Sequence, residues 1–117
     1  TNTWDAGVQL TAVDGASNDQ FGYSVSIGGD YAVIGANYDD TGAGSNAGSA
    51  WVFRRTGINT NTWDSGVKIV AGDGASNDQF GYSVAIDGDY AVVGAFFDNT
   101  AAGSDAGSAH IFGSIQE

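Results

Sequence analysis

The chain offers few side chains for catalysis. It has one histidine, His110, and no cysteine, so a cysteine–histidine pair is impossible. Asp39 and Asp40 form a carboxylate pair, but adjacent residues of an extended chain point to opposite sides. Glycosidases need two carboxyl groups about 5–10 Å apart across a substrate, and nothing in the sequence sets such a distance. Ser24 and Ser83 have no base nearby in the sequence and are interpreted as packing residues. We therefore expect no enzymatic activity.

Cofactor and metal sites are not expected either. The segment Gly42-Ala43-Gly44 lacks the lysine and the strand–helix context of a phosphate-binding loop. A cysteine metal site cannot exist without cysteine. The aspartates of the loops do not show the ligand spacing of a known metal site. We expect no cofactor and no bound metal.

Two long polar loops, residues 37–48 and 96–107, are better candidates for binding, because loops on a rigid scaffold often carry function. Each contains an aromatic residue followed by aspartate, and the aromatic ring can stack on a sugar or on a protein side chain. The candidate ligand-binding residues are Tyr38, Asp39, Asp40, Phe97 and Asp98. In the competing interpretation, which the large burial of aromatic side chains favours, Tyr38 and Phe97 only cover a sheet edge.

The charge limits the class of partner. Fourteen acidic residues stand against three basic ones, which gives a net charge of −11. A nucleic-acid backbone and an anionic membrane surface would both be repelled. No apolar run approaches the ~18 residues of a membrane-spanning helix, so we expect neither nucleic-acid binding nor membrane insertion. Cations, neutral glycans and basic protein patches remain as possible partners, and the interpretation that the acidic residues only keep the chain soluble is favoured over a specific cation role.

The elements that would position these residues occur twice. Thr1 returns as Thr60, an offset of 59 residues, and residues 1–53 are identical to residues 60–112 at 38 of 53 positions. A long period of this kind marks a repeat architecture, in which one unit cannot bury its apolar face alone. We expect two repeats, residues 1–59 and residues 60–117.

Each repeat is expected to contain four short β-strands and no helix. In the first repeat the strands are predicted at residues 4–12, 21–27, 31–36 and 49–53. The second of them alternates strictly, with large side chains on one side and Gly22, Ser24 and Ser26 on the other, which favours close approach of another backbone. Gly28-Gly29-Asp30 predicts a tight hairpin turn. The run at 31–36 is almost entirely apolar and predicts burial on both faces.

The Phe-Gly and Gly-Ala dipeptides of each repeat carry a family resemblance. They are Phe21-Gly22, Gly35-Ala36, Phe80-Gly81 and Gly94-Ala95. With their flanking strings the repeats resemble FG-GAP repeats of the bacterial variety, the blades of integrin-like β-propellers. Two departures from the family pattern stand out. Asn37 and Phe96 replace the usual proline, and short turns replace the calcium loop of many integrin blades, so no calcium site is carried over.

The resemblance implies an all-β propeller with an extracellular or cell-surface role in adhesion or recognition. The last repeat ends without an outer strand, and the N-terminal segment has the right character to complete a blade of a neighbouring copy. Because propellers close with about 4–8 blades, we expect a homotrimer of six blades or a homotetramer of eight. The alternatives are a lectin with one sugar site per blade, and a purely structural fibre subunit or engineered half-propeller. A further alternative is that the chain is a piece cut from a longer one.

Overall fold

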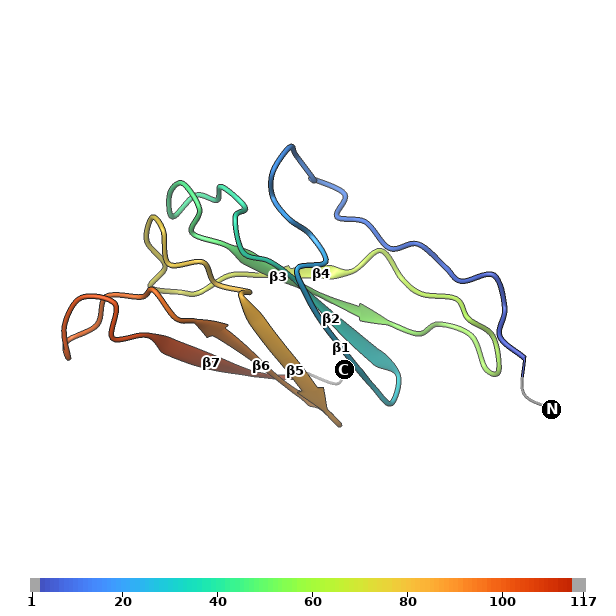
Figure 1. The fold of residues 1–117 in the computed structure, drawn as a ribbon. Coiled ribbons are helices and arrows are strands. Elements are labelled where there is room, and N and C mark those ends of the chain that lie inside the picture. Colours follow the sequence, from blue (N-terminus) through green and yellow to red (C-terminus); the bar gives the residue numbers. More distant parts are fainter. Residues whose placement is uncertain (1–2, 115–117) are drawn as a thin grey trace.

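A computed structural model describes residues 3–114, which form an all-β structure of two antiparallel sheets (Figure 1). The first sheet contains, in order across it, β1 (Ser24–Gly28), β2 (Tyr31–Ala36), β3 (Ser49–Arg54) and β4 (Val67–Ile69). The second sheet contains β5 (Ser83–Asp87), β6 (Tyr90–Ala95) and β7 (Ser108–Gly113). The expected all-β architecture of repeated sheets is confirmed.

A two-residue turn joins the first two strands of each sheet, as predicted. Gly28 pairs with Tyr31, so Gly29 and Asp30 alone reverse the chain. Gly29 has a φ of 54°, and Gly88 in the second sheet has a φ of 57°. Glycine adopts this left-handed conformation without steric cost, and the resulting turn matches the twist of a hairpin.

The first strand begins later than predicted, at Ser24 and not at Phe21. Gln20 and Gly22 have φ values of 61° and 96°, and both turn the chain before the strand starts. The backbone N–H of Gly22 donates to the carbonyl oxygen of Gly35 at 3.0 Å, which fixes this turn against β2. Phe21 therefore belongs to a turn, and the alternation of large and small residues extends into it.

Residues 4–12, which were expected to form an outer strand, contain no strand in this structure of a single copy. Its counterpart in the second repeat includes β4, which pairs with β3 through three residues. A strand needs a neighbouring backbone edge for its hydrogen bonds. Residues 3–12 pair with no strand in the described part of the chain, so they run extended without strand structure. Among the described residues, the second sheet contains three strands.

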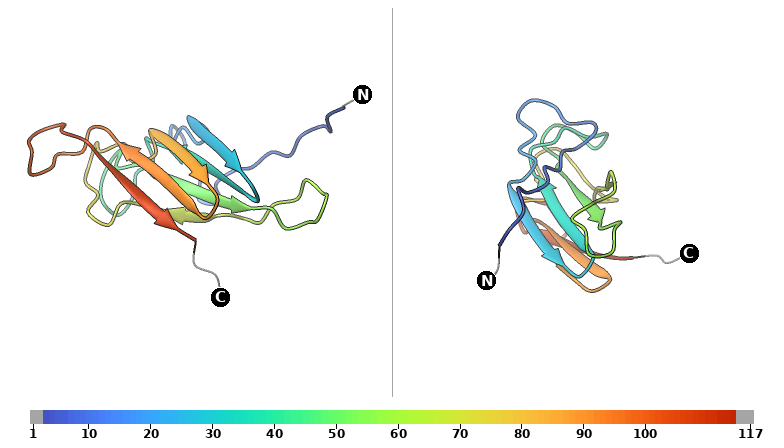
Figure 2. Two further views of the ribbon diagram at one scale, coloured as in Figure 1. Left: turned by 90° about the horizontal axis from the view of Figure 1, so that it is seen from below. Right: turned by 90° about the vertical axis from the view of Figure 1, so that its right-hand side faces the viewer.

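The two sheets stack face to face (Figure 2). The strand register shows which residues share each face of a sheet. The large face of the first sheet contains Val25, Ile27, Ile34 and Trp51, and its small face contains Ser24, Ser26, Val33 and Val52. The large face of the second sheet contains Val84, Ile86, Val93 and Phe112, and its small face contains Ser83, Ala85, Val92 and Ile111. The main core lies between the small face of the first sheet and the large face of the second.

Burial of the central strands follows from this stacking. Every residue of β2 after Tyr31 is buried, as the apolar run predicted. β6 has nearly the same sequence, but its burial alternates, because only one face of the second sheet is covered. A smaller cluster covers part of the large face of the first sheet, where Leu10 and Ala12 pack against Ile34 and Trp51.

Candidate functional site

The contact between the two sheets brings backbone against backbone. Ser24 Oγ donates a hydrogen bond to the carbonyl oxygen of Gly81 at 2.7 Å, and the backbone N–H of Ile86 donates to Ser26 Oγ at 3.2 Å. The small side chains of the first sheet permit this approach because they leave room for the neighbouring main chain. The predicted close approach on the small side of the strand is confirmed.

Glycine is required where the sheets come closest. A Cβ atom at Gly35 would overlap the carbonyl oxygen of Gly81, and a Cβ atom at Gly81 would overlap the carbonyl oxygen of Ser49. Gly81 also has a φ of 95°, which residues with a side chain rarely adopt. The Phe-Gly dipeptide of the second repeat therefore meets the Gly-Ala dipeptide of the first, and the two dipeptides form one contact between sheets.

Phe80 anchors that contact. It is 1% exposed, its backbone N–H donates to the carbonyl oxygen of Ala47 at 2.9 Å, and it forms a parallel bridge with Gly48. Its ring meets the rings of Phe112 and His110 edge to face, with centroids 6.0 Å and 5.7 Å away. The lone histidine thus packs among aromatic rings in the place that Trp51 holds in the first sheet.

Both halves of this contact recur, uncovered, on the outer sides of the stacked sheets. The large face of the first sheet exposes Val25 at 64% and Ile27 at 69%, and the small face of the second exposes Ile111 at 73%. The counterparts of these three residues lie half-buried between the sheets, at Val84, Ile86 and Val52. Apolar side chains at corresponding positions are therefore covered in one repeat and exposed to solvent in the other.

The glycines of the uncovered faces repeat the pattern. Gly22 has a φ of 96°, like Gly81, yet nothing lies within 4 Å of the place where its Cβ would be. Gly94 corresponds to Gly35, but a Cβ there would meet only Ser83 of its own sheet. Gly22 in the Phe-Gly turn of the first repeat and Gly94 in the Gly-Ala strand of the second therefore meet no other sheet within the described residues.

Lys68 pairs with two carboxylates beside the first sheet. Its Nζ lies 2.6 Å from Asp14 Oδ2 and 2.8 Å from Asp39 Oδ2. Burial of the ammonium works against its charge, but the hydrogen bonds to both aspartates outweigh this and raise the pKa of Lys68. Asp39 also accepts a hydrogen bond from Ser49 Oγ at 2.8 Å, and Nζ lies 5.9 Å from the Trp51 ring centroid.

The equivalent place in the second sheet holds carboxylates without a lysine. Asp98 is buried and accepts a hydrogen bond from Ser108 Oγ at 2.6 Å, but no lysine or arginine of residues 3–114 forms an ion pair with it. Burial raises the pKa of nearby Asp78, and the neighbouring Asp98 adds to that shift. His110 Nε2 lies 3.3 Å from Asp73 Oδ1.

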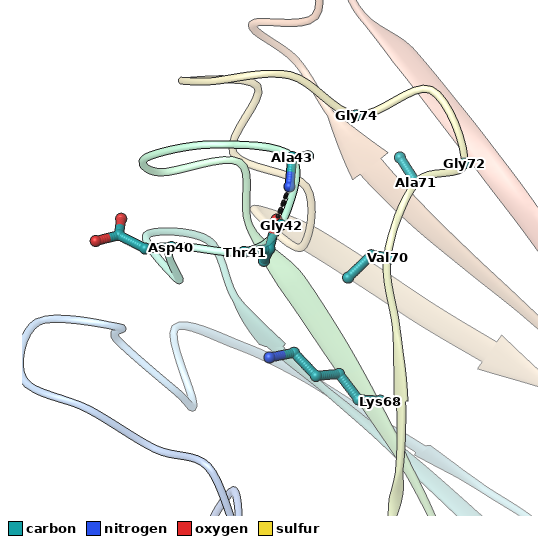
Figure 3. Close-up of a pocket in the computed structure, with 9 residues that line it drawn as sticks. All are labelled: Asp40, Thr41, Gly42, Ala43, Lys68, Val70, Ala71, Gly72 and Gly74. Atoms are coloured by element: carbon teal, nitrogen blue, oxygen red, sulfur yellow. Dashed lines mark hydrogen bonds between the residues drawn. The ribbon is translucent and has the colours of Figure 1, made fainter.

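The three aspartates predicted to bind a ligand are engaged within their own loops and sheets. Asp39 and Asp98 are buried in the hydrogen bonds just described. Asp40 Oδ1 accepts from the backbone N–H of Asn46 at 2.9 Å and so closes its loop. Asp40 borders an open hollow of about 640 Å³, but its carboxylate points away from the other labelled residues (Figure 3). Ligand binding by these residues stays a prediction.

Both repeats match one known repeat family. The model of the FG-GAP repeat matches residues 4–53 and again residues 63–112. The chain belongs to the FG-GAP repeat family. Neither the curated proteins nor the solved structures gave a match. The two sheets are accordingly two blade repeats of an integrin-like propeller module, a family that is generally non-catalytic and typically found in extracellular proteins.

The FG-GAP repeats also bring four aromatic rings, which are not adjacent as a set in the sequence, into one row. Tyr23 and Tyr82 lie side by side at 5.0 Å between centroids, Tyr82 lies 4.2 Å from Phe96, and Phe96 stacks on Phe97 at 4.0 Å. All four are between 36% and 52% exposed. A hydrogen bond with Tyr82 raises the pKa of Tyr23. Predicted residue Phe97 thus ends an exposed aromatic row, and Tyr38 is 36% exposed. The signal for the other three was the repetition of Tyr23 as Tyr82 and the change from Asn37 to Phe96.

The described residues contain neither a metal-binding group nor a membrane-spanning helix. Within residues 3–114, no three His, Cys, Asp or Glu side chains form a group that could hold a metal ion. The same part of the chain has no helix that is long and apolar enough to span a membrane.

Proposed function

We propose that this FG-GAP chain is a non-catalytic assembly unit that joins further copies of itself head to tail into a propeller. The large face of the first sheet in one copy packs on the small face of the second sheet in the next. The assembled propeller acts as an extracellular scaffold for adhesion or recognition, the role that the integrin-like family favours.

One observation carries the proposal: the uncovered faces are repeats of two faces that already pack on each other inside the chain. Val25 and Ile27 correspond to Val84 and Ile86, and Ile111 corresponds to Val52. Burying an apolar side chain of this size stabilises a contact by about 1.5–3 kcal/mol. Several such residues lie on each uncovered face, and the glycines that permit close approach are present on both, so a second copy is the occupant with a matching surface.

The contact is heterologous, because it joins two different faces. A heterologous contact makes a ring when its rotation closes and a filament when it does not. FG-GAP blades belong to propellers, and propellers close with about 4–8 blades. Three copies would give six blades and four copies eight, and we favour such a ring over a fibre.

Mixing two single variants tests the polarity of the contact. Ile27→Asp blocks only the large face of the first sheet, and it also places a carboxylate toward Asp87 of the next copy. Ile111→Asp blocks only the small face of the second sheet. Both side chains are largely exposed, so each variant should fold normally. We expect each variant alone to be monomeric and the mixture to form dimers containing one of each, measured by native mass spectrometry.

Mixed dimers would arise because Ile27→Asp leaves the small face of the second sheet intact, and Ile111→Asp leaves the large face of the first sheet intact. Homodimers of either single variant would overturn the head-to-tail arrangement. A wild-type chain that stays monomeric at every accessible concentration would overturn self-assembly altogether.

Glycan binding at the aromatic row is a second candidate, because exposed stacked rings are surfaces on which sugars stack. Tyr38 and Phe97, the aromatic residues of the loops, would take part. Binding on a glycan array that is lost in Tyr38→Ala and Phe97→Ala would support this function. Binding that survives both changes, or an array without signal, would count against it.

A further inference from the structure

We propose that residues 3–12 form the missing fourth strand of the second sheet in the next copy. This inference rests on the proposed head-to-tail assembly and specifies how the copies are joined. In the chain itself, β4 comes from the second repeat and completes the first sheet. The donated strand would do for the second sheet what β4 does for the first.

The edge of the second sheet is ready to accept a strand. β3 is paired on both sides, with β2 and with β4, whereas within residues 3–114 its counterpart β7 is paired only with β6. An unpaired edge presents a row of free N–H and C=O groups that pair readily with another extended chain. Residues 3–12 are identical at six of ten positions to residues 62–71, the segment that contains β4, and they can fill the same place.

The donor segment already lies where a preceding blade would need it. Ile69 and Ala71, at the end of β4 and after it, pack against the core that includes the large face of the second sheet. Their counterparts Leu10 and Ala12 pack on the large face of the first sheet. Residues 3–12 therefore lie where the outer strand of a neighbouring blade would lie if that blade were stacked on the large face of the first sheet. The three inner strands of that blade would come from the second sheet of the next copy. In Figure 1 it runs along the outside of the first sheet.

Trp4 shows that the segment lacks its partner. Trp63 is half-buried, packs against the cluster that contains Phe53, and donates from Nε1 to Asn61 Oδ1 at 2.7 Å. Trp4 has the same sequence context but is 94% exposed. In the donated strand it would lie against Phe112, the counterpart of Phe53. An indole left in solvent at a repeated position is explained by a contact that forms between copies.

The repeat fixes the register of the donated strand. In the first sheet Ala50 pairs with Ile69, Trp51 with Lys68, and Val52 with Val67. Shifting each partner by one repeat places Leu10 opposite Ala109, Gln9 opposite His110, and Val8 opposite Ile111. Gln9 then stands beside the carboxylates Asp73 and Asp98, where the first sheet has Lys68.

Engineered cysteines test this register, and the cysteine-free chain makes the result unambiguous. Residues directly opposite each other in an antiparallel pair are about 4.5–5.5 Å apart between Cα atoms, within the reach of a disulfide. The variant Val8→Cys with Ile111→Cys should form covalent multimers on mild oxidation, seen on non-reducing gels. The matched control, Val8→Cys with Ala109→Cys, is two residues out of register and should remain uncrosslinked.

Three outcomes distinguish the proposed strand donation from the proposed head-to-tail assembly. Cross-links in the in-register variant alone support strand donation. Copies that associate in native mass spectra without cross-linking in register would overturn strand donation and leave the head-to-tail assembly standing. Chains that neither associate nor cross-link would overturn both.

A gain of function gives an independent test. Gln9→Lys should let residue 9 pair with Asp73 and Asp98 of the next copy, as Lys68 pairs in the first sheet. We expect association about two- to five-fold tighter, the effect of a partly exposed ion pair. The control Ala6→Lys adds the same charge to the same segment, but its counterpart Ser65 is exposed and lies before β4. Equal tightening in both variants would contradict the proposed register.

Discussion

The first and second sheets have nearly one sequence but two environments. The first is stacked on its small face by the second sheet and completed by β4. Within the described part of the chain, the second is stacked only on its large face and has an unpaired outer edge. Residues such as Val33 and Val92 are therefore buried in one sheet and 38% exposed in the other. The comparison teaches that the position of a sheet in the stack, and not its own sequence, determines which of its FG-GAP residues are covered.

Phenylalanine truncation should give the largest difference between the two repeats. Phe80 is fully enclosed between the sheets, and Phe80→Ala should lower the free energy of unfolding by about 3–5 kcal/mol. Phe21, its counterpart, is half-buried and meets Phe53 at 6.1 Å between centroids. Phe21→Ala should therefore cost the isolated chain only about 1–2 kcal/mol. Urea unfolding measures both, and equal losses would break the comparison.

Glycine substitution should separate folding from assembly. Gly35→Ala introduces a Cβ that overlaps the backbone of Gly81, and we expect a loss of about 1–3 kcal/mol in stability. Gly94→Ala meets only the Ser83 side chain, which can rotate away, so unfolding should change little. It should nevertheless abolish association, because Gly94 would face Gly22 of the preceding copy. Urea unfolding and native mass spectrometry on both variants check this, and a Gly94→Ala variant that still associates would contradict the account.

Removing the lysine should make the first sheet resemble the second. Lys68→Met keeps much of the aliphatic length but leaves buried Asp39 without its cation. Loss of a charged hydrogen bond of this kind costs about 1–3 kcal/mol. Val67→Met, at an exposed position one residue away, is the control and should be nearly neutral. Thermal unfolding compares them, and a neutral Lys68→Met would show that Asp39 needs no cation.

Acid should produce the smallest effect, and with a defined sign. Burial raises the pKa of Asp78 above its usual 3.8, so the folded state holds this proton more tightly than the unfolded state does. The cost of burying the charge is therefore present at neutral pH and is relieved as the pH falls through the raised pKa. Asp78→Asn should lose this gain in stability on acidification. Unfolding curves of both proteins between neutral pH and pH 4 test it, and parallel pH profiles would contradict it.

Much of the fold was predictable because the repeated patterns are local. The bounds of β2, the tight turn at Gly29 and the small side that receives another backbone all follow from alternation and glycine placement. The missing outer strand of the last repeat follows from the phase of the repeat. The start of β1 was not predictable from the repeated pattern, because the positive φ of Gln20 is set by a turn and not by periodicity.

The environment of the predicted ligand-binding residues was not predictable, because it depends on contacts between repeats. Asp39 is neutralised by Lys68, which is supplied by the following repeat, and no spacing in the sequence indicates that pair. The row from Tyr23 to Phe97 joins residues of both repeats, which only stacking of the sheets brings together. Strand formation at residues 4–12 depends on a partner edge that the chain does not offer to them.

Native mass spectrometry of the unmodified chain tests the central claim most directly, since it counts copies without assuming which face they use. We predict a dominant assembly of three or four copies that dissociates when Ile27→Asp is introduced. A single copy at all concentrations would contradict the claim that the uncovered faces and the N-terminal segment join one copy to the next.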